Sequence, residues 1–301
     1  MTLMARHGIS VIFPAYNEEG NIAKAVAQAI DCLNDLFEDW EIIVVDDGSR
    51  DGTGKIIDGL AERDPRLVAV HHPRNEGYGA ALRSGIERAR RELIFFADSD
   101  LQFHLAELLL LLTWIEQYDI VIGYRVKRSD PLYRRINALG WKVLVRLLLG
   151  LKVKDIDCAF KMFRSYAFRM IKIDAVGAMV NTDILVQATR LGLKIREVPV
   201  THFPRLNGKQ TGANLRVILK AFRELVRLSV KLRTVEPAFS TYDRRTERRG
   251  IEIADRRRRE RRTVMLPINF RDRRYSVFHG NGSAVRIAAP KREVGLSHEG
   301  P

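Results

Sequence analysis

Short apolar segments alternate with segments of helical periodicity between residues 9 and 123, and this alternation restricts the fold more than any other feature of the sequence. Short, continuously apolar runs are typical of strands that are buried on both faces. Strands that alternate with helices predict an α/β fold with a mostly parallel sheet and helices on both of its faces. The predicted strands are 9–14, 41–45, 67–71, 93–97 and 119–123, and the predicted helices are 20–35, 53–63, 79–91 and 105–117.

Beyond residue 130 the pattern changes. Residues 131–151 and 214–232 combine leucines with arginines at helical spacing and are expected to be amphipathic, whereas 182–191 and 194–200 indicate another helix and strand. After Pro237 the chain is Arg-rich and aperiodic, which is typical of a largely disordered segment. We therefore expect a main α/β domain over 1–210, an amphipathic helical extension over 211–236 and an Arg-rich, largely disordered tail over 237–301.

The charge of the chain requires an anionic partner, which could be nucleic acid, a membrane surface or a phosphorylated substrate. The formal net charge is +14, and residues 236–301 hold 16 Lys/Arg against 9 Asp/Glu, so the tail carries half of it. Cys32 and Cys158 are the only cysteines, which favours a reducing compartment over a disulfide framework. No apolar run reaches the length of a membrane span, and residues 1–8 lack the apolar stretch of a secretory signal. A cytoplasmic protein, soluble or peripheral to a membrane, is expected.

Asp98 and Asp100 follow the predicted strand 93–97 directly. Two carboxylates at this spacing repel each other unless a cation lies between them. Hard oxygen ligands favour Mg²⁺ or Mn²⁺, and such ions keep open positions for substrate phosphates. Gln102 could add a third oxygen. The alternative is an ordinary Asp-rich turn that caps a helix.

Two further polar clusters follow predicted strands, at residues 14–18 and 46–49. Ligands of parallel α/β sheets bind beyond the carboxyl ends of the strands, so three such clusters are expected to converge on one crevice. Carboxylates there could bind a base and ribose while a cation binds a diphosphate. Turn and helix-cap chemistry is the alternative interpretation of these residues.

The order of these motifs resembles that of family 2 glycosyltransferases over roughly residues 8–235. Within that family the sequence is most similar to dolichyl-phosphate mannose synthase and bacterial polyprenyl-phosphate glycosyltransferases. The resemblance rests on four segments, namely 9–18 (ISVIFPAYNE), 45–53 (VDDGSRDGT), 75–81 (NEGYGAA) and 98–102 (DSDLQ).

This resemblance implies a GT-A fold, with a nucleotide-sugar site and a metal site at the ends of the strands. Arg125 and Arg134 match positions that relatives use near the diphosphate and the acceptor phosphate, residues 155–161 match a segment on the acceptor side, and residues 205–212 match a loop that closes over phosphates. The implied nucleotide-sugar ligands are Pro14, Tyr16, Glu18, Val45, Asp47, Ala97, Asp98, Ser99 and Lys209. The implied metal ligands are Asp98, Asp100 and Gln102, and the implied catalytic residues are Asp98, Asp100, Arg125, Arg134, Asp157 and Arg205.

The resemblance further implies transfer of a hexose, with inversion, from GDP-mannose or UDP-glucose to a polyprenyl or dolichyl phosphate. An acceptor phosphate is already ionised near pH 7 and needs no general base. A saccharide acceptor is the first alternative, and it would need a base such as Asp157 or Asp183. The second alternative is a polyanion-binding protein that acts through its basic tail, although no nucleic-acid-binding motif is present.

Membrane contact is expected at the inner face of the membrane, through the amphipathic segments 131–151 and 214–232, a basic patch or a membrane protein partner. Packing of those segments in the core is the alternative. Nothing in the sequence indicates the oligomeric state.

Overall fold

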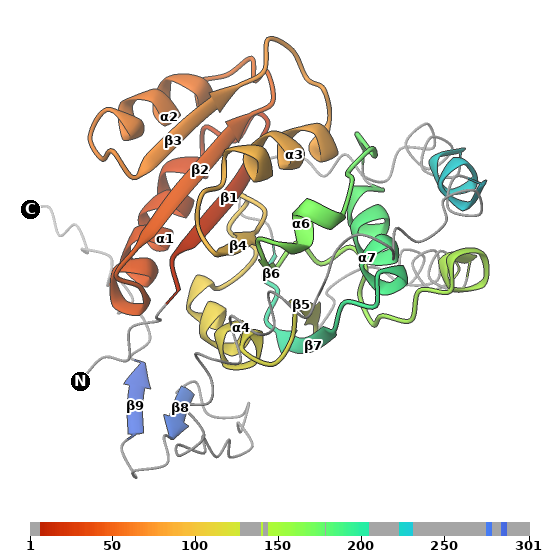
Figure 1. The fold of residues 1–301 in the computed structure, drawn as a ribbon. Coiled ribbons are helices and arrows are strands. Elements are labelled where there is room, and N and C mark those ends of the chain that lie inside the picture. The colour runs from red at the N-terminus through yellow and green to blue at the C-terminus, as the bar shows by residue number, and fades with distance from the viewer. Residues whose placement is uncertain are drawn as a thin grey trace, which may run out of the picture. The chain divides into compact units, whose positions relative to one another are not determined.

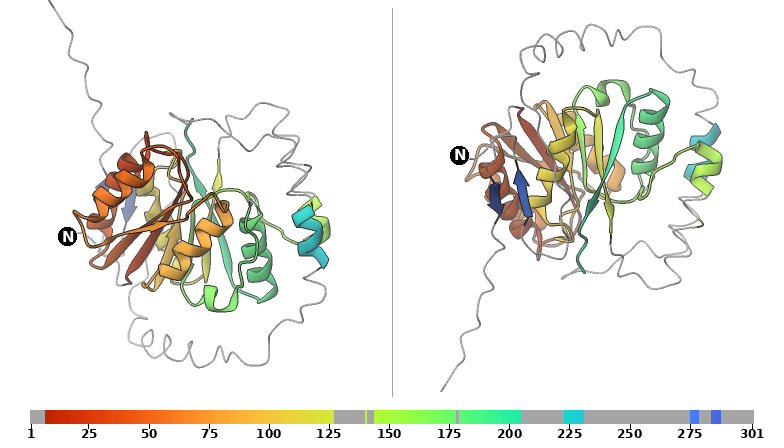
Figure 2. Two further views of the ribbon diagram at one scale, coloured as in Figure 1. Left: turned by 90° about the horizontal axis from the view of Figure 1, so that it is seen from above. Right: turned by 90° about the horizontal axis from the view of Figure 1, so that it is seen from below.

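The computed structural model describes residues 7–126, 140, 144–177, 179–204, 223–230, 275–278 and 284–287. The chain divides into two compact units, Leu3–Phe239 and Ser240–Pro301. The first unit contains a seven-stranded sheet with helices on both sides of it (Figures 1 and 2). This confirms the predicted α/β class.

The sheet has the strand order β3-β2-β1-β4-β6-β5-β7. Neighbouring strands are parallel except at β6, which runs antiparallel to both β4 and β5. The mostly parallel sheet that the alternation predicts is therefore confirmed. The strands are β1 (Ile9–Ala15), β2 (Trp40–Asp46), β3 (Leu67–His71), β4 (Leu93–Phe96), β5 (Ile120–Arg125), β6 (Lys161–Arg164) and β7 (Ile195–Val200).

Successive residues of each central strand point to opposite faces, so the two faces have separate hydrophobic cores. On β1, for example, Val11 and Phe13 belong to one cluster with α1 and α4, whereas Ile12 belongs to the other with α3 and α7. The helices are α1 (Ile22–Leu36), α2 (Thr53–Ala61), α3 (Tyr78–Arg88), α4 (Leu108–Ile115), α6 (Ala167–Met170) and α7 (Val180–Arg190), with a 3₁₀ turn η1 (Leu105–Glu107) before α4. Residues 144–149 and 223–230 are also helical.

β6 is the main element that the sequence pattern does not predict. It is short and has a charged residue at each end, Lys161 and Arg164, which is typical of a loop. Both side chains are nevertheless buried, because β4 and β5 pair with this strand from either side. Arg164 donates to the Ile115 carbonyl and to Glu92, so distant segments supply the partners that its burial requires.

The second unit contains a short antiparallel pair, β8 (Tyr275–Phe278) with β9 (Ala284–Ile287). This pair lies in the segment predicted to be largely disordered, and the sequence pattern does not predict it. The remainder of 237–301 lies outside the described residues, as do most of 131–143 and 205–222. Among the helices that the structure describes, none has the length and apolar character to cross a bilayer.

Candidate functional site

The candidate site lies at the carboxyl ends of β1, β2 and β4. β2 and β3 extend the sheet on one side of β1, while β4 extends it on the other side, so the chain reverses its direction of winding between β1 and β4. Such a switch point is where ligands bind in open α/β sheets. The predicted polar clusters follow these three strands, so the topology brings them to the same edge of the sheet.

The loops after β1 and β2 are joined by hydrogen bonds between their motifs. The Asn17 amide donates to the Ser49 hydroxyl at 2.9 Å, and the Arg50 amide donates to the Asn17 side-chain oxygen at 2.8 Å. The Glu18 amide donates to the Thr53 hydroxyl at 2.8 Å. Asn17 has a φ of 55°, a conformation in which Asn is more common than most residues. The turn chemistry of both motifs therefore builds one rigid rim of the site.

Asp47 is almost completely buried, and its carboxylate fixes a third segment of this rim. One oxygen accepts from the His72 ring at 2.7 Å and from the Glu76 amide at 2.8 Å, and the other accepts from the Gly77 amide at 2.9 Å. Three hydrogen bonds to a carboxylate are strong, because they are charge-assisted. Asp47 thus holds the segment that leads into α3, a contact that the sequence analysis did not predict.

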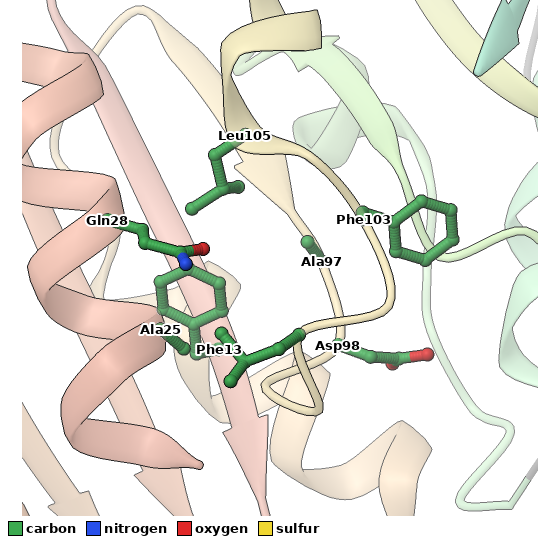
Figure 3. Close-up of a pocket in the computed structure, with 8 residues that line it drawn as sticks. Phe13, Ala25, Gln28, Ala97, Asp98, Phe103 and Leu105 are labelled. Atoms are coloured by element: carbon green, nitrogen blue, oxygen red, sulfur yellow. The ribbon is translucent and has the colours of Figure 1, made fainter. Parts of the chain in front are cut away.

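The loop that carries Asp98 and Asp100 is also held by its surroundings. The Ser99 hydroxyl donates to the Pro14 carbonyl at 3.1 Å, and Asp100 accepts from the Gln102 amide at 3.2 Å. Leu101 has a φ of 63°, which is unfavourable for a leucine and is tolerated where the surroundings enforce it. The Asp98 carboxylate points away from Phe13, Ala25 and Leu105 of the neighbouring pocket (Figure 3).

Asp98 and Asp100 fit a site for a divalent cation whose remaining coordination positions are filled by a bound substrate. Asp98 and Asp100 supply hard carboxylate oxygens at the edge of the sheet. Across the described part of the chain there is no group of three His, Cys, Asp or Glu residues that could hold a metal by itself. A site of two carboxylates leaves coordination positions for substrate phosphates, as Mg²⁺ sites do. The side chain of Gln102 is held toward the segment after β7, because its amide nitrogen donates to the Phe203 carbonyl at 2.9 Å.

Tyr78 is a site residue that the sequence analysis did not single out, although it lies within the 75–81 motif. Its hydroxyl is buried and makes no hydrogen bond of normal geometry to the described residues. Burial first, and then the negative charges of Asp98 and Asp100, raise the pKa of the phenol well above its ordinary value. Tyr78 therefore stays protonated and is a hydrogen-bond donor beside the two aspartates.

A second group of charged residues lies between β5 and β6. Arg125 donates to both oxygens of Asp155, at 2.7 and 2.8 Å, so its guanidinium is held by a bidentate pair. Lys161 is fully buried, and its ammonium donates to the carbonyls of Ile156, at 3.1 Å, and Cys158. Burial lowers the pKa of Lys161. These contacts fix residues 155–158, the segment that the resemblance places on the acceptor side.

The remaining predicted residues differ in their surroundings. The side chains of Val45 and Ala97 are in the hydrophobic core, so only their main chains face the edge of the sheet. Tyr16 is 42% exposed, whereas Glu18 is buried and accepts from the Asn21 amide group at 2.7 Å. Asp157 is exposed at the turn before β6. Arg134, Arg205 and Lys209 lie outside the described residues.

Asp183 is the other residue considered as a base for a saccharide acceptor, and its carboxylate is buried and engaged in hydrogen bonds that hold the local structure. It is 1% exposed and accepts from the amides of Asp174 and Ala175 at 3.2 and 3.3 Å and from the Gln187 side chain at 2.7 Å. These hydrogen bonds hold the segment before α7. That segment in turn contacts the start of α3, where the Gly79 amide donates to the Val176 carbonyl at 2.9 Å.

The fold is an open, mostly parallel α/β sheet with a polar edge at its switch point. Residues 10–171, more than half of the chain, match Glycosyl transferase family 2. The chain belongs to this family, as the resemblance of its motifs implies.

The similar curated proteins include several that are named for polyprenyl phosphates. A dolichyl-phosphate beta-glucosyltransferase of Trichomonas vaginalis is 31% identical over 209 residues, which cover 64% of this chain and 64% of that protein. An undecaprenyl-phosphate 4-deoxy-4-formamido-L-arabinose transferase of Pseudomonas aeruginosa is 30% identical over 212 residues, 70% of this chain and 62% of that protein. Glycosyltransferase AglD of Haloferax volcanii is 31% identical over 65% of this chain. The matched region thus spans from a third to just under two thirds of these relatives.

Solved structures confirm the GT-A fold. Glucosyl-3-phosphoglycerate synthase from Mycobacterium tuberculosis, in complex with Mn²⁺, UDP and phosphoglyceric acid, superposes with a TM-score of 0.60 at 22% identity, covering 77% of this chain and 81% of that one. The same enzyme with Mg²⁺ and UDP gives a TM-score of 0.57 at 21% identity, covering 75% of this chain and 79% of that one. At this identity the likeness concerns the fold alone.

Proposed function

We propose that this glycosyltransferase transfers a hexose from a nucleoside diphosphate to a polyprenyl phosphate at a membrane surface, in a metal-dependent reaction that inverts the anomeric carbon. The observation that carries the proposal is the placement of Asp98 and Asp100 at the switch point of the sheet, beside the interlocked loops after β1 and β2. The names of the relatives support the acceptor class. The proposed donor of the hexose is GDP-mannose or UDP-glucose.

Asp98 and Asp100 would hold the cation, with Gln102 as a further oxygen ligand. When bound, Mg²⁺ or Mn²⁺ neutralises the negative charge that develops on the departing diphosphate. The rim formed by Pro14, Tyr16 and the buried Asp47 segment would bind and orient the nucleoside. Orientation of this kind is a large part of the rate enhancement in transfer between two bound substrates.

In the proposed reaction an oxygen of the acceptor phosphate attacks the anomeric carbon as the bond from that carbon to the diphosphate oxygen breaks. The phosphate is ionised near pH 7, so no protein group has to remove a proton. Arg125, whose guanidinium is held in place by Asp155, would supply positive charge toward the acceptor. Electrostatic stabilisation by fixed positive charge is the main contribution expected from the protein here. Arg134, Arg205 and Lys209 are proposed to add to it.

Contact with a membrane surface is supported by exposed apolar side chains beside arginines. Leu147 is 77% exposed on the helical segment 144–149, and Val226 and Val230 are 44% and 57% exposed on the segment 223–230. Arg146 and Arg227 on the same two segments are exposed as well. The buried residues of both segments join the same hydrophobic cluster. Apolar groups flanked by cations suit the headgroup region of an anionic bilayer.

Transfer of radiolabel tests the proposal. The protein is incubated with labelled GDP-mannose or UDP-glucose, with Mn²⁺ or EDTA, and with or without polyprenyl phosphate in anionic vesicles. Label is expected in an acid-labile lipid product, and only when both the acceptor and the metal are present. The Asp98→Asn and Asp100→Asn variants are expected to form no labelled lipid. Label in a water-soluble saccharide, or transfer that EDTA leaves unchanged, would refute the proposal.

A further inference from the structure

Tyr78 places a buried hydroxyl beside the two aspartates at the edge of the sheet, and normal packing does not explain it. The ring of Tyr78 packs against the cluster that contains α3 and α7. A phenylalanine would make the same contacts. Burial of a hydroxyl without a partner is unfavourable, and such groups are uncommon in native proteins. The hydroxyl therefore needs an explanation other than the fold.

The position of Tyr78 is fixed from both sides of its backbone. On one side the Asp47 carboxylate binds the amides of Glu76 and Gly77. On the other side the main chain of residues 175–176 lies directly against Gly77 and Gly79, where an added Cβ would come within 2.5 and 2.2 Å of carbonyl oxygens. Gly77 has a φ of 103°, which is accessible to glycine but not to other residues. The side chain therefore leaves the backbone from a turn that cannot shift freely.

Asp98 is the carboxylate within reach of this buried hydroxyl. After burial, its charge and a hydrogen bond with its side chain contribute to the raised pKa of Tyr78, although the hydroxyl has no partner at normal hydrogen-bond length and angle. Hydrogen bonds in active sites are commonly long before ligands bind and shorten in the complex. A carboxylate that binds a metal through one oxygen is usually held by a hydrogen bond to the other.

We infer that Tyr78 is a positioning residue whose hydroxyl donates to the Asp98 carboxylate and orients it for the divalent cation. The chain of contacts runs from Asp47 on β2 through the turn at 76–77 to Tyr78, and from there to Asp98 after β4. This inference rests on the proposed function, because it assumes that a cation binds at Asp98 and Asp100. It gives the 75–81 motif a role in metal binding that is separate from contact with the nucleotide.

Binding of Mn²⁺ tests this inference without turnover. Free Mn²⁺ is measured by electron paramagnetic resonance in the presence of UDP and, separately, GDP, for the wild-type protein, Tyr78→Phe and Tyr118→Phe. Tyr118 follows α4 and is half-buried in the other core cluster, so it controls for loss of a phenol hydroxyl elsewhere. Thermal unfolding is recorded for each variant.

Tyr78→Phe is expected to weaken Mn²⁺ binding about tenfold or more, as is typical of lost hydrogen bonds to metal ligands. Its thermal stability should equal or exceed that of the wild type, because the ring and its packing remain. Tyr118→Phe should bind Mn²⁺ as the wild type does. Equal Mn²⁺ affinity of Tyr78→Phe and the wild type, or the same loss in Tyr118→Phe, would overturn the inference while leaving the proposed function intact. If the wild-type protein takes up no Mn²⁺ with either nucleotide, the proposed function fails and this inference with it.

Discussion

The contact between the start of α3 and residues 175–176 gives a sharp test of the structure, because one added methyl group should disrupt it. In a Gly79→Ala variant the new Cβ would lie 2.2 Å from the Ala175 carbonyl oxygen and 2.9 Å from the Val176 carbonyl carbon. Cβ atoms do not approach other atoms more closely than 3.0 Å, and the groups in the way are backbone rather than flexible side chains. Either α3 or the 175–176 segment must move.

The expected loss of stability can be estimated from these distances. Overpacking against a rigid neighbour costs about 1–3 kcal/mol, and displacement weakens the hydrogen bond from the Gly79 amide to Val176, which contributes about 1 kcal/mol. The gain in helix propensity from Gly to Ala offsets at most about 1 kcal/mol. The free energy of unfolding should therefore fall by roughly 1–3 kcal/mol.

Gly59 provides a matched control on another helix. It lies within α2, and an added Cβ would meet nothing within 4 Å. Gly59→Ala should therefore raise the free energy of unfolding by about 0.5–1 kcal/mol. Urea denaturation of the three proteins measures both effects. A Gly79→Ala variant as stable as Gly59→Ala would refute the close packing of α3 against residues 175–176.

Three further predictions concern other parts of the molecule. The hydrogen bond to Glu116 raises the pKa of His7, so His7 stabilises the fold fully below its unfolded pKa of 6.5 and loses this contribution as pH rises through its folded pKa. The difference in the free energy of unfolding between the wild type and His7→Gln should thus be largest below pH 6.5 and shrink as the pH rises above it, and a constant difference would contradict this prediction. Burial raises the pKa of the Cys158 thiol to about 11, while the charge of the nearby Lys161 lowers it. Lys161→Met should therefore slow the reaction of Cys158 with a thiol reagent in a variant lacking the other cysteine, and a faster or unchanged rate would refute that role. Leu147→Asp should weaken binding to anionic vesicles about tenfold in a sedimentation assay, since one exposed leucine leaves the bilayer, and unchanged binding would exclude this helix from the contact.

Much of the fold could be predicted because the central strands are buried on both faces. β1 and β2 are buried along their whole length and mostly apolar for this reason, and the helix over 22–36 shows its buried residues at intervals of three and four. β6 could not be predicted, because its two charged residues are buried by pairing with β4 and β5 on either side, and the partners of Arg164 are the distant Ile115 carbonyl and Glu92. The burial of a charged strand depends on segments far away in the sequence.

The candidate site was predictable to a similar degree. The positions of Asp47 and Asp98 after buried strands follow from the sequence pattern together with the topology of parallel sheets. The three hydrogen bonds of Asp47 to residues 72–77, and the approach of Tyr78 to Asp98, depend on how loops 20–30 residues apart pack together. No local pattern contains that information. The motif at 75–81 was a signal that this segment matters, but it did not indicate which side chain acts.

The most direct measurement for the whole account is the anomalous diffraction of Mn²⁺ in crystals grown with the nucleotide. The proposal predicts a single strong manganese peak between the Asp98 and Asp100 carboxylates, with metal–oxygen distances of about 2.0–2.2 Å, and with diphosphate oxygens completing its coordination. A manganese peak elsewhere, or nucleotide bound at the ends of β1, β2 and β4 with no metal at these aspartates, would contradict the proposed mechanism.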